Sequence, residues 1–117
     1  MSQFARVSEE QVGDVDVVGI AGEIDASNAR LLGARLRSAL SNRSVALVVD
    51  LADTAYLDSA ALNLLFELDA DLRRRRQRLH LLVPPSAPVA RLLAISGVAG
   101  TIATHATREA ALAQAAA

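Results

Sequence analysis

Ser59 is the side chain of this sequence best placed for chemistry. It follows Asp58 and precedes Ala60 and Ala61, at the predicted first turn of a helix. The free N–H groups and the dipole of a helix N-terminus favour an added phosphate. The same residues also suit a simple N-cap, in which Asp58 or Ser59 contributes about 1 kcal/mol to the fold. Local chemistry thus allows two interpretations, a phosphorylation site and a helix cap.

A second polar segment lies before an earlier predicted helix. Residues 22–28 read Gly-Glu-Ile-Asp-Ala-Ser-Asn, and either Asp25 or Ser27 can cap the helix that follows. In parallel sheets, binding sites favour the carboxyl ends of strands, where helix N-termini point. Residues 22–28 and 56–62 both occupy such strand-to-helix connections. We therefore expect these two segments to carry the functional surface.

The composition excludes several kinds of chemistry. The 117 residues include no Cys, and the aromatic residues are Phe4, Tyr56 and Phe66. Disulfides, cysteine nucleophiles, Cys-based zinc sites and aromatic platforms for single-stranded nucleic acid are excluded or disfavoured. All twelve basic residues are Arg, so no lysine amine is present for Schiff-base chemistry. A reactive atom in this chain is expected to be a hydroxyl or carboxylate oxygen.

The sequence does not favour an enzyme. Ser59 lies in Leu-Asp-Ser-Ala-Ala, whereas a serine hydrolase elbow reads Gly-x-Ser-x-Gly. The chain has no Gly-x-Gly-x-x-Gly loop and no phosphate-loop lysine. His80 and His105 fall in predicted strands without metal-ligand spacing, so we expect structural roles for them. We predict a protein without catalysis of its own, without a cofactor and without a metal site.

The run of four arginines at 73–76 suggests either an anionic partner or a solvated helix end. Asp69 and Asp71 stand one turn earlier, at i,i+4 spacing from Arg73 and Arg75, and cations at a helix C-terminus complement its dipole. These features favour the solvated helix end. The net charge is −1, the longest apolar runs are far below the about 20 residues of a membrane span, and the start lacks a signal peptide pattern. We expect a cytoplasmic protein with no direct nucleic-acid contact and no membrane insertion.

Apolar periodicity alternates between strand-like and helix-like along the chain, which is typical of an α/β layer fold. We predict strands at 4–7, 15–22, 45–51, 79–83 and 101–105, with a turn at 53–55. Helices are predicted from Asp25 or Ser27 to about 42, from 59 to 76, from Ser86 or Pro88 to about 96, and from 107 onward. The order β-β-α-β-α-β-α-β-α describes one domain over residues 1–117. It predicts a four- to five-stranded mixed sheet, with an N-terminal hairpin followed by mainly parallel strands.

Four segments together resemble a known family. They are Gly-Glu-Ile-Asp at 22–25, Val-Val-Asp-Leu at 48–51, Tyr-Leu-Asp-Ser-Ala-Ala-Leu at 56–62 and Leu-Leu-Ala-Ile-Ser-Gly-Val at 92–98. In this order they resemble the STAS family, whose single-domain members are bacterial anti-sigma factor antagonists. The resemblance covers nearly the whole chain and implies a STAS-like fold.

The resemblance also implies a function in transcription regulation and stress response. Ser59 would be phosphorylated by an anti-sigma factor that is an ATP-dependent serine kinase, and a serine phosphatase would restore the free hydroxyl. The unphosphorylated antagonist would bind the anti-sigma factor and release its sigma factor. The implied partner surface comprises Glu23, Asp25, Ser27, Asn28, Asp58, Ser59, Ala60, Ala61 and Leu62.

One departure from the family pattern keeps an alternative open. The family usually has Ser/Thr-Gly after the switch serine, where this chain has Ala60 and Ala61. Alanine at 61 replaces the least bulky residue at a site that a kinase must approach, and it raises helix propensity. The alternative is a STAS scaffold or accessory subunit that does not switch, such as a stressosome component or the partner of an ABC-type lipid transporter.

Overall fold

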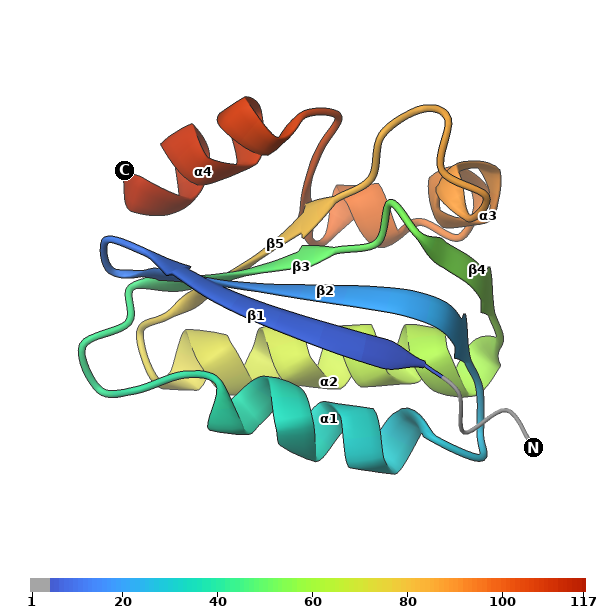
Figure 1. Cartoon of the computed structure of the whole chain (residues 1–117), viewed down its shortest axis with the longest axis horizontal. Coiled ribbons are helices and arrows are strands. Elements are labelled where there is room, and N and C mark those ends of the chain that lie inside the picture. The colour runs from blue at the N-terminus through green and yellow to red at the C-terminus, as the bar shows by residue number, and fades with distance from the viewer. Residues whose placement is uncertain (1–4) are drawn as a thin grey trace.

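The computed structural model describes residues 5–117 as a mixed sheet with helices on both faces (Figure 1). The strands are β1 Arg6–Val12, β2 Val15–Ile24, β3 Ala46–Asp50, β4 Thr54–Leu57, β5 Arg78–Leu82 and β6 Ala103–His105. The helices are α1 Ala29–Ser38, α2 Ser59–Arg74, α3 Ala90–Ile95 and α4 Arg108–Ala116, with a 3-10 turn at Val98–Gly100. Phe4, assigned above to the first strand, lies outside the described residues.

The sheet confirms the predicted α/β class and its mixed character. Its strand order is β1-β2-β3-β5-β6, and β4 pairs with β2 off this path. Only β1 and β2 run antiparallel, as the predicted hairpin, and the other pairs are parallel. Gly13 occupies the hairpin turn with φ of 62°, a left-handed conformation that suits glycine. Helices α1 and α2 cover one face, and α4 lies on the other (Figure 1).

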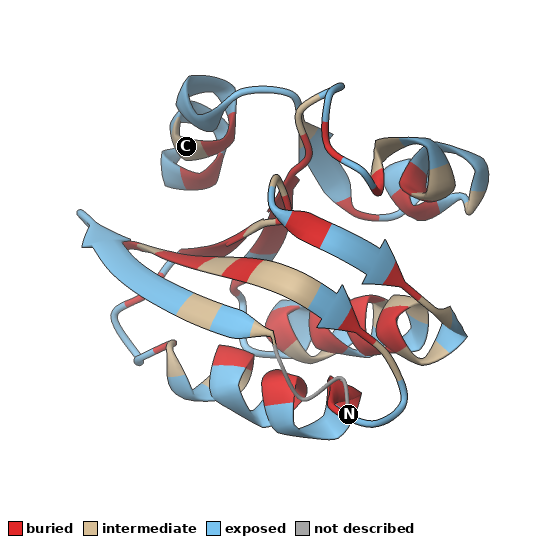
Figure 2. Ribbon diagram, turned by 45° about the vertical axis from the view of Figure 1, so that its right-hand side comes forward, coloured by how far each residue is buried: buried red, intermediate tan, exposed pale blue. Residues whose placement is uncertain are grey.

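The core has two unequal parts. The larger part lies between the sheet and the α1–α2 layer, and the smaller part lies beneath α4 (Figure 2). Successive strand residues alternate between them, so Val49 packs in the first part and Val48 in the second. Gly33 brings α1 close to α2, because a Cβ atom there would lie 2.7 Å from Cδ1 of Leu64. The larger core therefore fixes α2, which carries Ser59, against both α1 and the sheet.

The main difference from the prediction is strand β4. Residues 53–55 were predicted to turn the chain, but Thr54 begins a strand that pairs with the last residues of β2. Gly22, with φ of 113°, lies where the register of this pairing shifts. Thr54 is fully buried, and its hydroxyl donates to the carbonyl of Ile20 at 2.7 Å. The formation of β4 therefore depends on a tertiary hydrogen bond and a bulge. Its four residues are of mixed polarity and show no apolar periodicity that would have predicted a strand.

Several predicted boundaries are also corrected. The first strand extends to Val12, and α1 ends at Ser38 rather than near 42. The N-cap of α1 is Asn28, not Asp25 or Ser27, because Asp25 begins a separate turn that precedes the helix. Helix α3 begins at Ala90, after a turn over the residues predicted to open it. Helices α2 and α4 begin where the sequence predicts.

Candidate functional site

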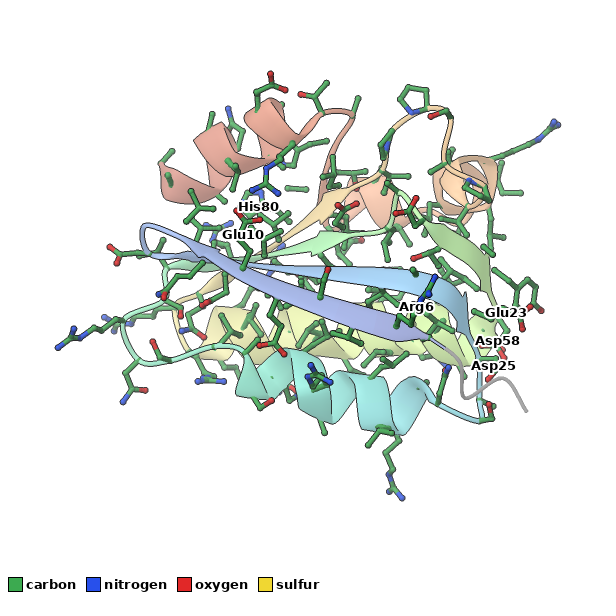
Figure 3. All side chains as sticks on the ribbon, in the orientation of Figure 1. Arg6, Glu10, Glu23, Asp25, Asp58 and His80 are labelled. Carbon is green, nitrogen blue, oxygen red and sulfur yellow. The ribbon has the colours of Figure 1, made fainter. Side chains whose placement is uncertain are left out.

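Strand β4 brings the two predicted site segments together. It pairs Glu23 with Tyr56 and Ile24 with Leu57, so the residues that follow each strand emerge side by side. The amide of Asp58 donates to the carbonyl of Ile24 at 3.3 Å and continues this pairing by one residue. The labelled side chains of Glu23, Asp25 and Asp58 gather at one end of the molecule (Figure 3).

The carboxylate of Asp58 links the two segments directly. Its Oδ1 accepts a hydrogen bond from the amide of Ala61 at 3.0 Å, which confirms Asp58 as the N-cap of α2. Its Oδ2 accepts from the amide of Ala26 at 3.0 Å, 32 residues away in the sequence. One side chain therefore caps the helix and also holds the connection between β2 and α1 against it.

Asn28 supports the other segment from behind. Its side chain is buried, Oδ1 accepts from the amide of Asp25 at 3.0 Å, and Nδ2 donates to the carbonyl of Glu23 at 2.8 Å. Asp25 in turn accepts from the amide and the hydroxyl of Ser27. Asn28 thus lies beneath the surface, while Glu23 and Ser27 are exposed and Asp25 is half-buried.

Ser59 is the exposed first residue of α2. Its hydroxyl makes no hydrogen bond to any residue that the structure describes, so its oxygen is accessible to an incoming group. A phosphate here would meet the free N–H groups of the helix N-terminus. It would also lie next to the carboxylate of Asp58, whose two oxygens already accept backbone hydrogen bonds. The arrangement can therefore hold an added charge in place, and that charge would change the character of the surface.

The two alanines after Ser59 point in different directions. Ala60 is half-buried and faces a groove, whereas Ala61 is 1% exposed and packs in the larger core. Leu62 is half-buried against the same core. The methyl group at position 61 therefore adds no bulk to the surface that a kinase would approach, contrary to the sequence-based expectation.

The groove beside Ser59 runs between α1 and α2. Gly33 and Leu64 form part of its floor, and Arg30, Asn63 and Glu67 are exposed along it. These groove residues cannot be identified from the sequence, because their proximity depends on how the two helices pack. Tyr56 is a further exposed residue that was not predicted as part of the site, although it is an aromatic within segment 56–62.

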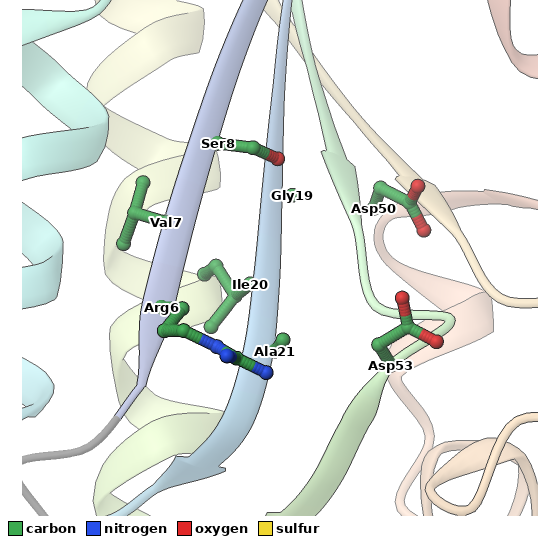
Figure 4. A pocket seen from close by; sticks show the side chains of 8 residues that line it. All are labelled: Arg6, Val7, Ser8, Gly19, Ile20, Ala21, Asp50 and Asp53. Atoms are coloured by element: carbon green, nitrogen blue, oxygen red, sulfur yellow. The ribbon is translucent and has the colours of Figure 1, made fainter.

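A second, smaller depression lies on the sheet face that also carries α4 (Figure 4). Its volume is about 160 Å³. Arg6 on β1 lies at one side of this depression, and Asp50 and Asp53 lie at the other side. The Oδ1 atom of Asp50 accepts from the amide of Ala52 at 2.9 Å, which stabilises the turn after β3. None of the residues lining this depression belongs to the predicted site.

The two histidines meet, which their sequence separation gave no reason to expect. Nδ1 of His80 and Nε2 of His105 lie 2.9 Å apart, and the two rings are stacked. Burial, together with the charges of His105 and Arg78, lowers the pKa of His80. Within residues 5–117, no group of three or more His, Asp or Glu side chains is arranged to hold a metal ion.

The arginine run forms the other end of α2. Arg73 pairs with Asp69 at 3.1 Å, as the i,i+4 spacing predicts. Asp71, however, pairs with Arg37 on α1 and with Arg74, and not with Arg75. The hydrogen bond from Arg37 is the main reason that the pKa of Asp71 is lowered. Asp71 therefore pairs with Arg74 within α2 and with Arg37 on α1, in place of the predicted partner Arg75.

Comparison with known proteins identifies the fold. Among curated protein sequences, none matched the chain. An anti-sigma factor antagonist from Mycobacterium paratuberculosis is similar in structure, with a TM-score of 0.84 and 24% identity over 97% of this chain and 95% of that chain. The phosphorylated form of the Bacillus cell fate determinant SpoIIAA gives 0.66 and 21% identity over 93% and 98%. A sulfate transporter family protein from Wolinella succinogenes gives 0.71 and 17% identity over 92% and 88%.

Within the described residues 5–117, no helix has both the length and the apolar character needed to cross a bilayer.

The family assignment rests on a match in sequence. The family model described as "Mlab, STAS domain" matches residues 7–104, which is most of the chain. This match includes both segments that β4 brings together at Ser59. The chain therefore belongs to the STAS domain family.

Proposed function

We propose that this protein is an anti-sigma factor antagonist whose binding is controlled by phosphorylation of Ser59. The observation that carries the proposal is the exposed Ser59 hydroxyl, which has no hydrogen-bond partner among the described residues and follows Asp58, the residue that links the two segments. The partner is an anti-sigma factor with ATP-dependent serine kinase activity. When it binds the antagonist it releases its sigma factor, and transcription of a stress response follows in the cytoplasm.

The phosphoryl transfer uses chemistry that the partner supplies. The Ser59 oxygen attacks the γ-phosphorus of ATP held by the kinase, the bond to ADP breaks, and the serine proton passes to a base of the kinase. The chain itself contributes a fixed position, since Asp58 caps the helix that begins at Ser59. A serine phosphatase would reverse the change by hydrolysing the phosphate ester.

The added phosphate would weaken binding through its charge. It brings roughly −1.5 to −2 charges to a surface where Glu23, Asp25 and Asp58 already lie. Burying these groups together against a partner costs more once the phosphate is present, because like charges repel and lose water.

The surface proposed for the partner is defined by exposure. It comprises Glu23, Asp25, Ser27, Asp58, Ser59, Ala60 and Leu62 from the family resemblance, extended by Tyr56 and the groove residues Arg30 and Asn63. Asn28 and Ala61 are buried, so we assign them a supporting role beneath it.

A phosphorylation and pull-down experiment tests the proposal. The wild type is incubated with a kinase-type anti-sigma factor and Mg-ATP, and mass spectrometry locates the phosphate. We expect modification of Ser59, retained binding for Ser59→Ala and lost binding for Ser59→Asp. Ser38→Ala, at an exposed serine at the end of α1, is the matched control and should behave as the wild type. Modification elsewhere, or equal binding of both Ser59 variants, would contradict the proposal.

A second candidate is an accessory subunit that docks constitutively, without a switch. The structural similarity to a sulfate transporter family protein favours it, and so does the replacement of Ser/Thr-Gly by Ala60 and Ala61, which raises helix propensity after Ser59. In that case Ser59 remains unmodified, and Ser59→Asp changes binding no more than other single surface changes do. Co-purification with a transporter ATPase, or a large defined assembly on sizing, would identify this function.

A further inference from the structure

The C-terminal end of α2 carries a group of arginines that is not part of the Ser59 surface. Arg73, Arg76 and Arg78 line one depression, together with Gln77. Arg73 is held by Asp69, and its guanidinium also donates to the carbonyl of Thr101 at 3.1 Å. Arg76 and Arg78 form no ion pair with any residue that the structure describes. Three arginines therefore line one depression, and of these only Arg73 has a carboxylate partner among the described residues.

The backbone conformation at Arg76 is a second unusual feature of this end of α2. Arg76 has φ of 59° and is the one residue other than glycine with a positive φ in the described part of the chain. It occupies the position after the C-cap of α2, where its amide donates to the carbonyl of Arg73 and the next amide to that of Leu72. Helices ending in this motif usually place glycine there, because a side chain is strained in this conformation. Arginine in place of glycine at this position is therefore unusual.

The wall of the depression is rigid. The side chain of Gln77 is buried, and its Nε2 donates to the carbonyls of Ser41 and Ser44 at 2.9 and 3.0 Å. These bonds tie the end of α2 to the loop before β3, which carries the exposed Arg43. The dipole of α2 explains cations within its last turn, but Arg76 and Arg78 lie beyond the helix. Their position calls for a different explanation.

We propose that this depression binds a small phosphate group. Guanidinium groups recognise oxyanions through paired N–H donors, and a tetrahedral dianion can accept from three of them at once. A carboxylate offers two oxygens and one charge, so it matches three guanidinium groups less well. The residues named here include no aromatic side chain on which a nucleic-acid base could stack. The ligand is therefore free phosphate or a small phosphate monoester, and the site is independent of Ser59.

The test is an amide NMR titration of the full chain with inorganic phosphate at constant ionic strength. We expect saturable shifts confined to residues 73–78, with a dissociation constant of about 1 mM. Arg76→Gly should weaken binding by about tenfold and yet raise the melting temperature by about 3 °C, because it removes both a phosphate contact and the backbone strain. Arg91→Gln, at an exposed arginine on α3, should bind phosphate as the wild type does.

Further ligands distinguish the sources of the phosphate. Tighter binding of O-phosphoserine than of inorganic phosphate would point to a phosphorylated protein, and equal binding to the free ion. Binding of duplex DNA alone, with steep salt dependence and no saturation by phosphate, would overturn the proposal. Unchanged phosphate binding by Arg76→Gly would overturn it as well, provided that the variant has the expected gain in stability.

Discussion

The two faces of the sheet are covered to different depths. On one face, α1 and α2 bury long aliphatic side chains such as Leu36, Leu68 and Leu72. On the other face, α4 buries only Ala111 and Ala115 over the sheet, with Leu112 partly buried beside them. Ser59 and the proposed partner surface around it lie on the well-packed side, because Ser59 is the first residue of α2. The exposed serine therefore stands on a helix whose inner face is firmly packed.

Substitution in the larger core should give the largest effect. Leu68 is fully buried in the middle of α2, so Leu68→Ala is expected to lower the free energy of unfolding by about 3 kcal/mol through lost burial and a new cavity. Leu112→Ala on α4 is the matched control and should cost less than about 1.5 kcal/mol, since that side chain is partly exposed. Denaturant unfolding measures both. Equal losses of unfolding free energy in the two variants would show that packing on the two faces contributes equally to stability.

Asp58 tests how firmly the Ser59 surface is attached to the larger core. Asp58→Ala removes the N-cap of α2 and the bond to Ala26, and it should lower the free energy of unfolding by about 1 to 2 kcal/mol. Asp58→Asn keeps an acceptor oxygen for the cap and should cost less. Hydrogen exchange at the amides of Ala26 and Ala61 should increase in Asp58→Ala. Protection that stays unchanged at both amides would show that other contacts hold the segments together.

The stability of the face covered by α4 should depend more on pH than the stability of the face covered by α1 and α2. The pKa of His80 is held below its usual value of 6.5, first by burial and then by the charges of His105 and Arg78. When the pH falls below 6.5, the unfolded chain binds this proton before the folded chain does. The free energy of unfolding should therefore decrease with falling pH until the lowered pKa is reached.

Replacement of the buried histidine tests this dependence. His80→Gln should flatten the profile of unfolding free energy below about pH 7, down to the lowered pKa of His80. His105→Gln is the control, because it leaves His80 buried and should keep part of the slope. If His80→Gln retained the full slope of the wild type, the dependence would come from other groups.

The smallest effect is expected at the ion pair between α1 and α2. The pKa of Asp71 is lowered, mainly by its hydrogen bond from Arg37, so its contribution to stability is present above pH 3.8 and is lost as the pH falls through the lowered value. Asp71→Asn should cause a slight loss at neutral pH that disappears at high salt, since the pair is accessible to solvent. A loss as large as that of Asp58→Ala would mean that this pair, and not burial, joins the two helices.

The parts of the fold that follow from local pattern could be predicted from the sequence. Strand β3 is a continuous apolar run, and α2 and α4 begin at side chains that cap them. Strand β4 could not be predicted, because its pairing depends on Thr54 reaching the carbonyl of Ile20. The contact between His80 and His105 depends on the register of β5 and β6, which no local pattern reports.

The candidate site was predictable in part for the same reason. Ser59 and Asp58 were identified from their place before a helix, and the structure confirms Asp58 as its cap. Burial of Asn28 could not be inferred, since it depends on how the segment before α1 folds. Ala61 shares the buried face of α2 with Leu64 and Leu68, but its small side chain adds little to the apolar pattern. The groove with Arg30 and Asn63 likewise arises from the close approach of two helices.

The double hydrogen bond of Asp58 makes the Ala26 amide a remote spectroscopic reporter. Ala26 is distant from Ser59 in sequence, yet its N–H donates to the carboxylate beside that serine. A change in charge at Ser59 will alter the electron density on the shared carboxylate, and the resonance of Ala26 will move with it. The occupancy of the serine can therefore be followed in solution, without a partner protein, at a nucleus on the opposite segment.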